Sequence, residues 1–233
     1  MNAMNSNAGR VVSNSTAIGT QALENPSSNA NNNTAVGYQA GAQLTSGSNN
    51  VMVGNASRIT TGSNSIAIGV GANAGAFSNS VAIGSGATAS ASNHIRIGNG
   101  AITLATTSQS WTVVSDRRKK SNIIDSPLGL DFIKTLRPVS YFKINDDNKK
   151  TEYGFIAQEV EVALNNVGDT NNGVVHIDPV GNYGLRYNDF IPMTVKAVQE
   201  QQVLIEKLQK DNAALKATNE AILKRLDALE NRK

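Results

Sequence analysis

Ser115 and Lys120, five positions apart, are the residues of this chain whose types best suit covalent chemistry. A serine hydroxyl becomes a strong nucleophile when a neighbouring base takes its proton, and a lysine amine can be that base. The amine accepts the proton only when it is neutral, so its pKa has to lie several units below the ordinary value of about 10.4. Loss of water and the nearby cations of Arg117, Arg118 and Lys119 both act in that direction. Spacing alone does not separate such a dyad from two solvated side chains on a turn.

The composition excludes most other kinds of catalytic site. The chain has no cysteine, so it has no disulfide, thiolate metal site or cysteine nucleophile. His94 and His176 are its only histidines, so we assign neither a role and expect no metal and no cofactor. A glycosidase needs paired carboxylates, whereas residues 1–110 contain a single acidic residue, Glu24.

Charge and hydropathy limit the partners. The net charge of +3 does not favour nucleic acid, and no stretch approaches the ~18 apolar residues of a membrane-spanning helix. The first ten residues lack the apolar run of a secretory signal. We therefore expect a protein that is made in a cytoplasm, stays soluble, and neither enters a membrane nor binds nucleic acid.

The chain changes character at residue 111, just before the dyad. Residues 1–110 carry four charged and two aromatic side chains, and residues 111–233 carry the other 35 charged side chains. The two parts therefore fold by different means. We predict a repeat domain at 1–110, a compact domain at 111–197 and a coiled coil at 198–233.

Six short apolar runs closed by glycine recur in the first domain. Successive closing glycines lie 18, 17, 15, 15 and 14 positions apart, at Gly19, Gly37, Gly54, Gly69, Gly84 and Gly98. Each run is rich in β-branched residues and is followed by a loop of Asn, Ser, Ala and Gly, which predicts a strand. Such units bury their apolar side only by stacking, so we predict a solenoid.

The interior and the partners of this solenoid follow from the same runs. We expect Ile or Val to fill the interior, and small side chains to allow tight coils, as at Ala17, Ala35, Ala67 and Ala82. One thin stack encloses little core, so we expect parallel chains to pack side by side. The alternative is a disordered Asn- and Ser-rich tract, which would not need six glycine-closed runs.

These runs, among them "STAIG", "SIAIG" and "SVAIG", resemble the "NSxAIG" repeats of YadA-type trimeric adhesin heads. The resemblance covers about residues 13–100 and implies a left-handed parallel β-roll shared by three chains. Some of these heads bind collagen or host surfaces, and the same roll serves as a stiff spacer in phage fibres.

A heptad pattern follows Ile191. Its a positions are Val198, Ile205, Asn212, Asn219 and Leu226, and its d positions are Gln201, Leu208, Leu215, Ile222 and Leu229. Almost five heptads favour an α-helical coiled coil, in which polar a residues penalise slipped registers. The heptads do not distinguish two strands from three. A single helix packed on its own domain is the alternative.

The segment between the solenoid and the heptads reads as a small α/β domain. "SPLGLDFIKTL" predicts a helix with Ser126 as its N-cap and Pro127 at the first helical position. "PVSYFKI" alternates as a strand, "EYGFIAQEVEVAL" predicts a strand and then a helix, and "GNYGLRYNDFIP" predicts another strand. The fold class is therefore mixed, and the resemblance to trimeric adhesin heads implies that three chains are intertwined.

Four sequence words in this segment occur in one order and at close to one spacing in a known family. They are "SDRRKKSNI", "FIKTLRPVSYFKI", "YGFIAQEVE" and "LRYNDFIPMTVKAVQEQQ". They resemble the C-terminal intramolecular chaperone of endosialidase-type phage tail spikes and tail fibres. The same self-cleaving domain occurs in the myelin regulatory factor.

The resemblance implies a role for each residue near the dyad. In that family a Ser–Lys dyad cuts the chain beside the serine after the domain has helped three chains assemble. By motif, Ser115 is then the nucleophile and Lys120 the general base. Asp116, Arg118 and Asn122 match the motif and support the turn. The residue before this lysine is often apolar in the family, whereas this chain has Lys119 there.

Both bonds beside Ser115 are candidates for the cut. Attack on the carbonyl of Val114 passes through a five-membered ring and cuts between Val114 and Ser115. A cut between Ser115 and Asp116 needs a different geometry of attack. The sequence does not decide between them.

We therefore expect the end of a phage tail fibre or tail spike, a homotrimer whose chaperone domain removes itself in a single turnover. The chain would assemble in the host cytoplasm and the fibre would join the virion, with a host cell-surface receptor or glycan as a further partner. The alternative is a non-catalytic, adhesin-like fibre that binds a surface receptor through its repeats. A regulatory factor of the myelin type is disfavoured because no basic DNA-binding domain precedes the dyad.

Overall fold

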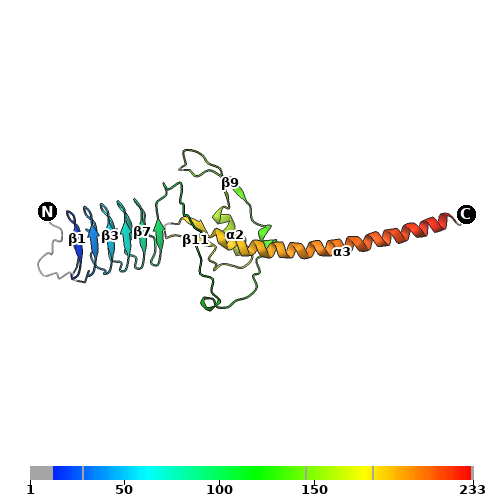
Figure 1. Ribbon diagram of the computed structural model, residues 1–233, viewed down its shortest axis with the longest axis horizontal. Helices are drawn as coiled ribbons and strands as arrows, with labels where there is room; N and C mark the ends of the chain where they lie inside the picture. Colours follow the sequence, from blue (N-terminus) through cyan, green and yellow to red (C-terminus); the bar gives the residue numbers. More distant parts are fainter. Residues whose placement is uncertain (1–12, 28, 145, 180, 232–233) are drawn as a thin grey trace. The chain divides into compact units, whose positions relative to one another are not determined.

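The computed structural model describes residues 13–231, except residues 28, 145 and 180 (Figure 1). The start of the predicted repeat domain and the segment tested for a secretory signal lie outside the described residues. The chain divides into two compact units. One comprises residues 1–110, 143–150 and 178–182, and the other comprises residues 111–142, 151–177 and 183–233. None of the described helices is both long and apolar enough to cross a membrane.

Each of the six glycine-closed runs forms a three-residue strand of one parallel sheet. Neighbouring strands pair in the order of the chain and without a slip of register, so that Ala35 lies opposite Met52 and Met52 opposite Ala67. The predicted solenoid is confirmed, and Figure 1 shows its rungs in blue to green. The strands are β1 (Thr16–Ile18), β2 (Thr34–Val36), β3 (Val51–Val53), β5 (Ile66–Ile68), β7 (Val81–Ile83) and β8 (Ile95–Ile97).

A second, smaller sheet was not predicted. The strands β4 (Arg58–Ile59) and β6 (Asn73–Gly75) pair in parallel, and an isolated bridge joins Asn73 to Thr88. Ile59 and Ala74 from these strands are fully buried in the solenoid core. The loops between the main strands therefore also stack rung upon rung.

The middle residues of β2, β3, β5 and β7 are buried inside the solenoid, so the prediction that the Ile and Val of these runs fill the interior is wrong. Ala35, Met52 and Ala67 are fully buried, whereas Ile18 is 59% exposed and Ile83 is 39% exposed. Successive side chains of a strand point to opposite faces, so the middle residue of these strands points inward while the first and third residues point outward. The first and third residues of the strands therefore line an outward-facing apolar stripe.

A column of polar side chains lies inside the solenoid, one residue before each of β2, β3, β5 and β7. Asn33, Asn50, Ser65 and Ser80 are at most 1% exposed. The backbone N–H of Asn50 donates to Asn33 Oδ1 at 3.0 Å, that of Ser65 to Asn50 Oδ1 at 2.9 Å, and that of Ser80 to Ser65 Oγ at 3.1 Å. Each buried polar group thus has a partner in the neighbouring rung, which offsets the cost of its burial.

The closing glycines are required by the backbone. Gly54 has φ +125°, and a Cβ atom there would lie 2.6 Å from the carbonyl oxygen of Gly69 in the next rung. Any other residue would clash with that carbonyl and would be strained at this φ. The recurrence of glycine in the sequence therefore reports the close stacking of successive turns.

The second unit is a small α/β body, as predicted. A core of seven buried side chains holds it together, among them Phe132, Val160 and Leu164. Its short strands form two antiparallel pairs, β9 with β10 and β11 with β12. The elements are α1 (Leu130–Ile133), β9 (Val139–Tyr141), β10 (Glu152–Gly154), α2 (Ala157–Asn166), β11 (Val175–Ile177), β12 (Tyr183–Leu185) and α3 (Phe190–Glu230), with 3₁₀ turns η1 (Arg117–Lys119) and η2 (Tyr187–Asp189).

The predicted N-terminus of the first helix is wrong. The helix α1 begins at Leu130 with Gly129 as its N-cap, and Ser126 Oγ instead accepts from the backbone N–H of Leu128 at 3.2 Å. The backbone N–H of Leu130 donates to Glu200 Oε2 of α3 at 2.7 Å. A carboxylate 70 residues away thus satisfies the free donor of this helix end, a contact that local sequence cannot reveal.

The last helix, α3, has 41 residues and two different parts. Phe190, Met193 and Ala197 are buried in the second unit. From Gln201 to Glu230 every side chain is exposed in the single chain. The predicted long C-terminal helix is confirmed, whereas its association into a coiled coil stays a prediction.

Candidate active site

A 3₁₀ turn brings the predicted dyad together. The turn η1 lies between Asp116, its N-cap, and Lys120, whose backbone N–H donates to the carbonyl of Arg117. Lys120 itself is extended, with φ −122° and ψ 143°. Its Nζ lies 2.7 Å from Ser115 Oγ and donates a hydrogen bond to it. This is the distance over which a proton passes between a base and a nucleophile.

Asp116 and Arg118 hold this turn in shape. Asp116 Oδ1 accepts from the backbone N–H of Arg118 at 2.8 Å, and Asp116 Oδ2 accepts from Arg118 Nη2 at 2.6 Å. The Arg118 side chain and, after it, its backbone N–H lower the pKa of the Asp116 carboxyl, and the same contact raises the pKa of Arg118. The two motif residues thus close the turn on which Ser115 and Lys120 lie.

The remaining residues of the motif region differ in what they contribute: Asn122 affects the backbone, and Arg117 and Lys119 carry charge. Asn122 has φ +50°, a left-handed conformation that asparagine tolerates better than most residues. Arg117 and Lys119, the predicted neighbouring cations, are exposed on the turn. Asn122 therefore redirects the chain after the dyad and takes no part in the contact between Ser115 and Lys120.

The dyad is open to solvent in the single chain. Ser115 and Lys120 are both exposed, and the preceding Val114 is 76% exposed. The polar contacts that the structure records for residues 115–120 are made within the turn itself. A lysine amine acts as a base in its neutral form, which desolvation favours. The geometry of a dyad is therefore present, but its shielding from water is not.

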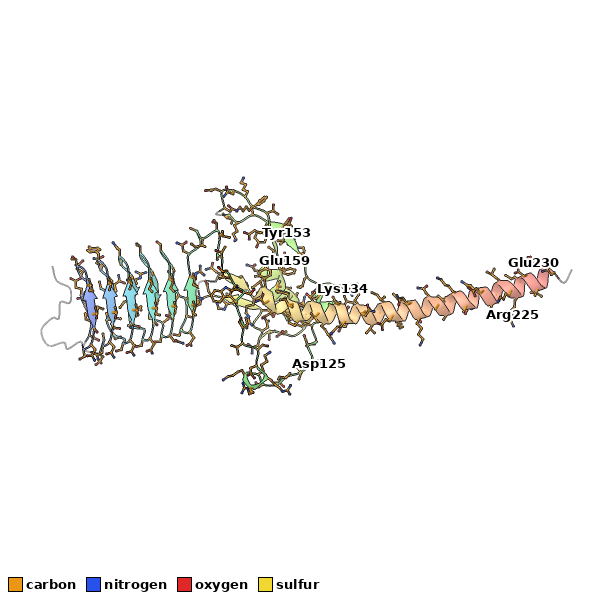
Figure 2. The ribbon with its side chains drawn as sticks, in the orientation of Figure 1. Asp125, Lys134, Tyr153, Glu159, Arg225 and Glu230 are labelled. Carbon is orange, nitrogen blue, oxygen red and sulfur yellow. The ribbon has the colours of Figure 1, made fainter. Side chains whose placement is uncertain are left out.

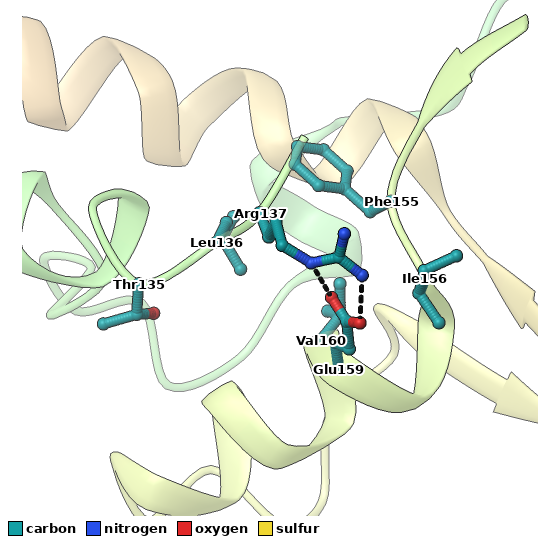
Figure 3. Close-up of a pocket in the computed structure, with 7 residues that line it drawn as sticks. All are labelled: Thr135, Leu136, Arg137, Phe155, Ile156, Glu159 and Val160. Atoms are coloured by element: carbon teal, nitrogen blue, oxygen red, sulfur yellow. Dashed lines mark hydrogen bonds and ion pairs between the residues drawn. The ribbon is translucent and has the colours of Figure 1, made fainter. Parts of the chain in front are cut away.

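An ion pair that the sequence did not single out supports the second unit (Figure 3). Arg137, just before β9, binds the carboxylate of Glu159 in α2 through Nε and Nη2. Hydrogen bonding to Arg137 lowers the pKa of Glu159. The adjoining cavity of about 30 Å³ is lined by Leu136, Phe155 and other residues shown in Figure 3, a volume on the scale of one water molecule. This pair joins β9 to α2 and does not form a substrate site.

The described residues contain no group of three or more His, Asp or Glu side chains that could hold a metal ion. His94 Nδ1 accepts from the backbone N–H of Ser90 at 3.2 Å, within a loop of the solenoid. His176 lies in β11. Among the described side chains, the dyad is thus the arrangement that best suits covalent chemistry.

Comparison with known families places this turn at the start of a recognised domain. Residues 115–169 match the family model Peptidase_S74, chaperone of endosialidase. This family is one of self-cleaving peptidases, and the predicted resemblance is confirmed for this segment. The chaperone-of-endosialidase segment begins at Ser115 itself and ends just after α2. Searches of the curated proteins and of the solved structures found no match.

Proposed function

We propose that this chain is part of a phage tail fibre or tail spike whose chaperone segment assembles three chains and then cuts itself free beside Ser115. The observation that supports this best is the distance of 2.7 Å between Lys120 Nζ and Ser115 Oγ. The contact lies within a segment that matches a family of self-cleaving chaperones. Assembly takes place in the host cytoplasm, and the trimeric shaft then joins the virion.

The chemistry of a cut between Val114 and Ser115 needs the dyad and water. The neutral amine of Lys120 takes the proton of the Ser115 hydroxyl, and Oγ bonds to the carbonyl carbon of Val114. The bond from that carbon to the nitrogen of Ser115 breaks as the nitrogen receives the proton. Water then hydrolyses the ester, which leaves a carboxylate on Val114 and a free N-terminal amine on Ser115.

Exposure of the dyad explains why the cut would wait for assembly. In the single chain both members of the dyad are solvated, and water favours the charged amine. Packing of neighbouring chains over the turn removes that water and favours the neutral amine. Cleavage then reports that the chains have associated.

Two surfaces support association of several copies. The outward stripe of the solenoid is apolar, with Ile18 at 59% and Ile97 at 65% exposed. The exposed part of α3 carries the apolar heptad residues, among them Leu208 at 60% and Leu229 at 63% exposed. A surface that faces only water rarely carries regular rows of apolar side chains. Rows of this kind mark sites at which proteins associate. Three copies are the number that the family resemblance implies.

The proposal is tested by the length of the purified chain. Ser115→Ala removes the nucleophile and Lys120→Ala the base, so both variants should remain uncut, with a rate at least about 10²-fold lower for the lysine variant. Lys119→Ala is the matched control, because it removes the neighbouring lysine without touching the hydroxyl, and it should still cut. Denaturing electrophoresis measures the rate, and mass spectrometry of the fragments identifies the bond.

One result would overturn the proposed cleavage, and another would overturn its dependence on assembly. One is a wild-type chain that forms trimers and stays intact after long incubation, which would make the molecule a passive adhesin-like fibre. The other is cutting at the wild-type rate by a variant that cannot trimerise, which would separate the chemistry from assembly.

A further inference from the structure

The turn that carries the dyad also carries a carboxylate. Asp116 follows Ser115 directly, and η1 returns Lys120 Nζ to within 2.7 Å of Ser115 Oγ. A lysine amine has three donors at the end of a long, flexible side chain. A carboxylate on the residue next to its hydrogen-bond partner is therefore within its reach.

A carboxylate beside Lys120 would oppose the proposed chemistry. The amine takes the proton of the hydroxyl only in its neutral form. An opposite charge within about 4–6 Å favours the charged form of a group and shifts its pKa by about 1–3 units. Removal of water on assembly strengthens this attraction, because the effective dielectric constant falls. A free Asp116 carboxylate would thus hold Lys120 in the form that cannot act as a base.

In the structure Arg118 occupies both oxygens of this carboxylate. Asp116 Oδ1 accepts from the backbone N–H of Arg118 at 2.8 Å and from its Nε at 3.1 Å. Asp116 Oδ2 accepts from the same Nε at 3.1 Å and from Nη2 at 2.6 Å. The planar guanidinium presents its donors in a fork that matches a carboxylate. Both oxygens of Asp116 therefore have partners other than Lys120.

Closure of the turn does not by itself require the guanidinium. The cap of η1 is the bond from the backbone N–H of residue 118 to Asp116 Oδ1, and any residue except proline supplies that N–H. The Arg118 side chain is 87% exposed, and exposed ion pairs contribute little to stability. The occupation of Asp116 Oδ2 therefore calls for a reason beyond the shape of the turn.

The recorded contacts of this turn all lie within it. Among the residues that the structure describes, no hydrogen bond or ion pair joins residues 115–120 to another element. The turn has two further cations, Arg117 and Lys119, which are exposed and which disfavour the charged form of a neighbouring amine. Asp116 is the one acidic residue of the turn, so it is the group whose charge has to be kept from Lys120.

A second carboxylate lies close by in the sequence. Asp125 comes five residues after Lys120, beyond η1, and its exposed side chain is labelled in Figure 2. It offers a group of the same chemistry at a different place, and hence a control for the role of Asp116.

We propose that Arg118 is a positioning residue for the self-cleavage: it holds the carboxylate of Asp116 away from Lys120, so that the amine can become neutral. This inference rests on the proposed function, because it assigns Arg118 a part in that reaction. The recorded bonds of the guanidinium all go to Asp116, so Arg118 acts through that carboxylate and not on the hydroxyl of Ser115.

The rate of self-cleavage at a series of pH values tests this role. The full chain is made by cell-free synthesis, moved to each pH and followed by denaturing electrophoresis. Arg118→Gln removes the guanidinium and keeps the backbone N–H that caps the turn. At neutral pH it should cut about tenfold more slowly than the wild type, the effect of one pH unit on the neutral fraction of an amine. The ratio of the two rates should rise toward one above about pH 10.5, where the amine of either chain is largely neutral.

A second substitution separates this role from a structural one. Asp116→Asn combined with Arg118→Gln lacks the ion pair but also lacks the carboxylate, and the asparagine oxygen still caps the turn. This double variant should regain most of the wild-type rate at neutral pH. If the ion pair only held the turn in shape, the double variant would stay as slow as Arg118→Gln at every pH. Arg118→Gln combined with Asp125→Asn is the matched control, and it should stay slow.

The outcomes separate this inference from the proposed function. Cutting by Arg118→Gln at the wild-type rate at every pH would overturn the role of Arg118. So would a slow rate whose ratio to the wild type does not change with pH and which Asp116→Asn does not restore. Equal restoration by Asp125→Asn would overturn the assignment of Asp116. In these cases the wild-type chain still cuts, so the proposed function stands, whereas a wild-type chain that assembles and stays intact would overturn both.

Discussion

The buried polar column of the solenoid makes a quantitative prediction at Asn50. Its Oδ1 accepts from the backbone N–H of Ser65 at 2.9 Å, and its Nδ2 donates to the carbonyl of Gly62 at 2.8 Å. Asn50 is 1% exposed and Ser65 is fully buried. Asn50→Ala would therefore leave one buried donor and one buried acceptor without a partner.

The size of the loss follows from these two groups. An unsatisfied buried backbone group costs about 1–3 kcal/mol, so the two together cost about 2–6 kcal/mol. Domains typically unfold with about 5–15 kcal/mol, and a loss of 1 kcal/mol lowers the midpoint of a domain of this size by about 4–8 °C. Asn50→Ala should lower the midpoint of solenoid unfolding by at least about 8 °C.

The chain itself provides the control. In the next rung the same column contains Ser65, whose Oγ accepts from the backbone N–H of Ser80 at 3.1 Å and donates to the carbonyl of Phe77 at 2.9 Å. Asn50→Ser should therefore retain a partner for the N–H of Ser65 and lose less than half as much stability as Asn50→Ala. Far-ultraviolet circular dichroism of the full chain during heating and in urea measures both variants.

Two results would refute this reasoning. A midpoint for Asn50→Ala within about 2 °C of the wild type would mean that the buried polar column does not stabilise the solenoid. Equal losses for the alanine and serine variants would mean that volume, rather than hydrogen bonding, decides at this position.

Two further contacts make predictions. Because Arg118 lowers the pKa of Asp116, the contact between them is complete above the ordinary pKa of 3.8 and is lost as the pH falls through the lowered value. An NMR titration of the Asp116 carboxyl should have its midpoint below 3.8, and Arg118→Gln should raise that midpoint; equal midpoints in the two chains would contradict the contact. Glu200→Gln should lower the free energy of unfolding of the second unit by about 1 kcal/mol, because it weakens the charged cap on the N–H of Leu130. Urea unfolding followed by the helical circular dichroism signal measures this loss, and an unchanged midpoint would contradict the role of the cap.

The repeat was predictable because every rung requires the same local sequence, a short apolar run closed by glycine. A glycine such as Gly54 is needed at each point where two turns approach closely. The runs before these glycines have the β-branched residues that are typical of strands. The orientation of those runs was not predictable, because Ala67 and its neighbours Ile66 and Ile68 are all apolar. The closed turn decides which side of the strand faces inward, and it places the alanine there.

The candidate site was predictable to a different degree. The motif placed Ser115 and Lys120 in one turn, and the fold brings their reactive atoms together within it, since all the contacts that shape the turn are local. The contact of Glu200 with α1 and the pair of Arg137 with Glu159 join segments far apart in the sequence. A single sequence gives no signal for such pairings.

The stacking of the solenoid has a consequence for how a fibre of this kind changes length. Each rung is hydrogen-bonded to the rungs immediately above and below it, with no slip of register between them. Duplication of one whole unit of about 15 residues would thus lengthen the shaft by a single strand spacing of about 4.8 Å, with the dyad left as it is. Under the proposed function, the length of the shaft and the cleavage beside Ser115 are then separate traits that selection can adjust independently.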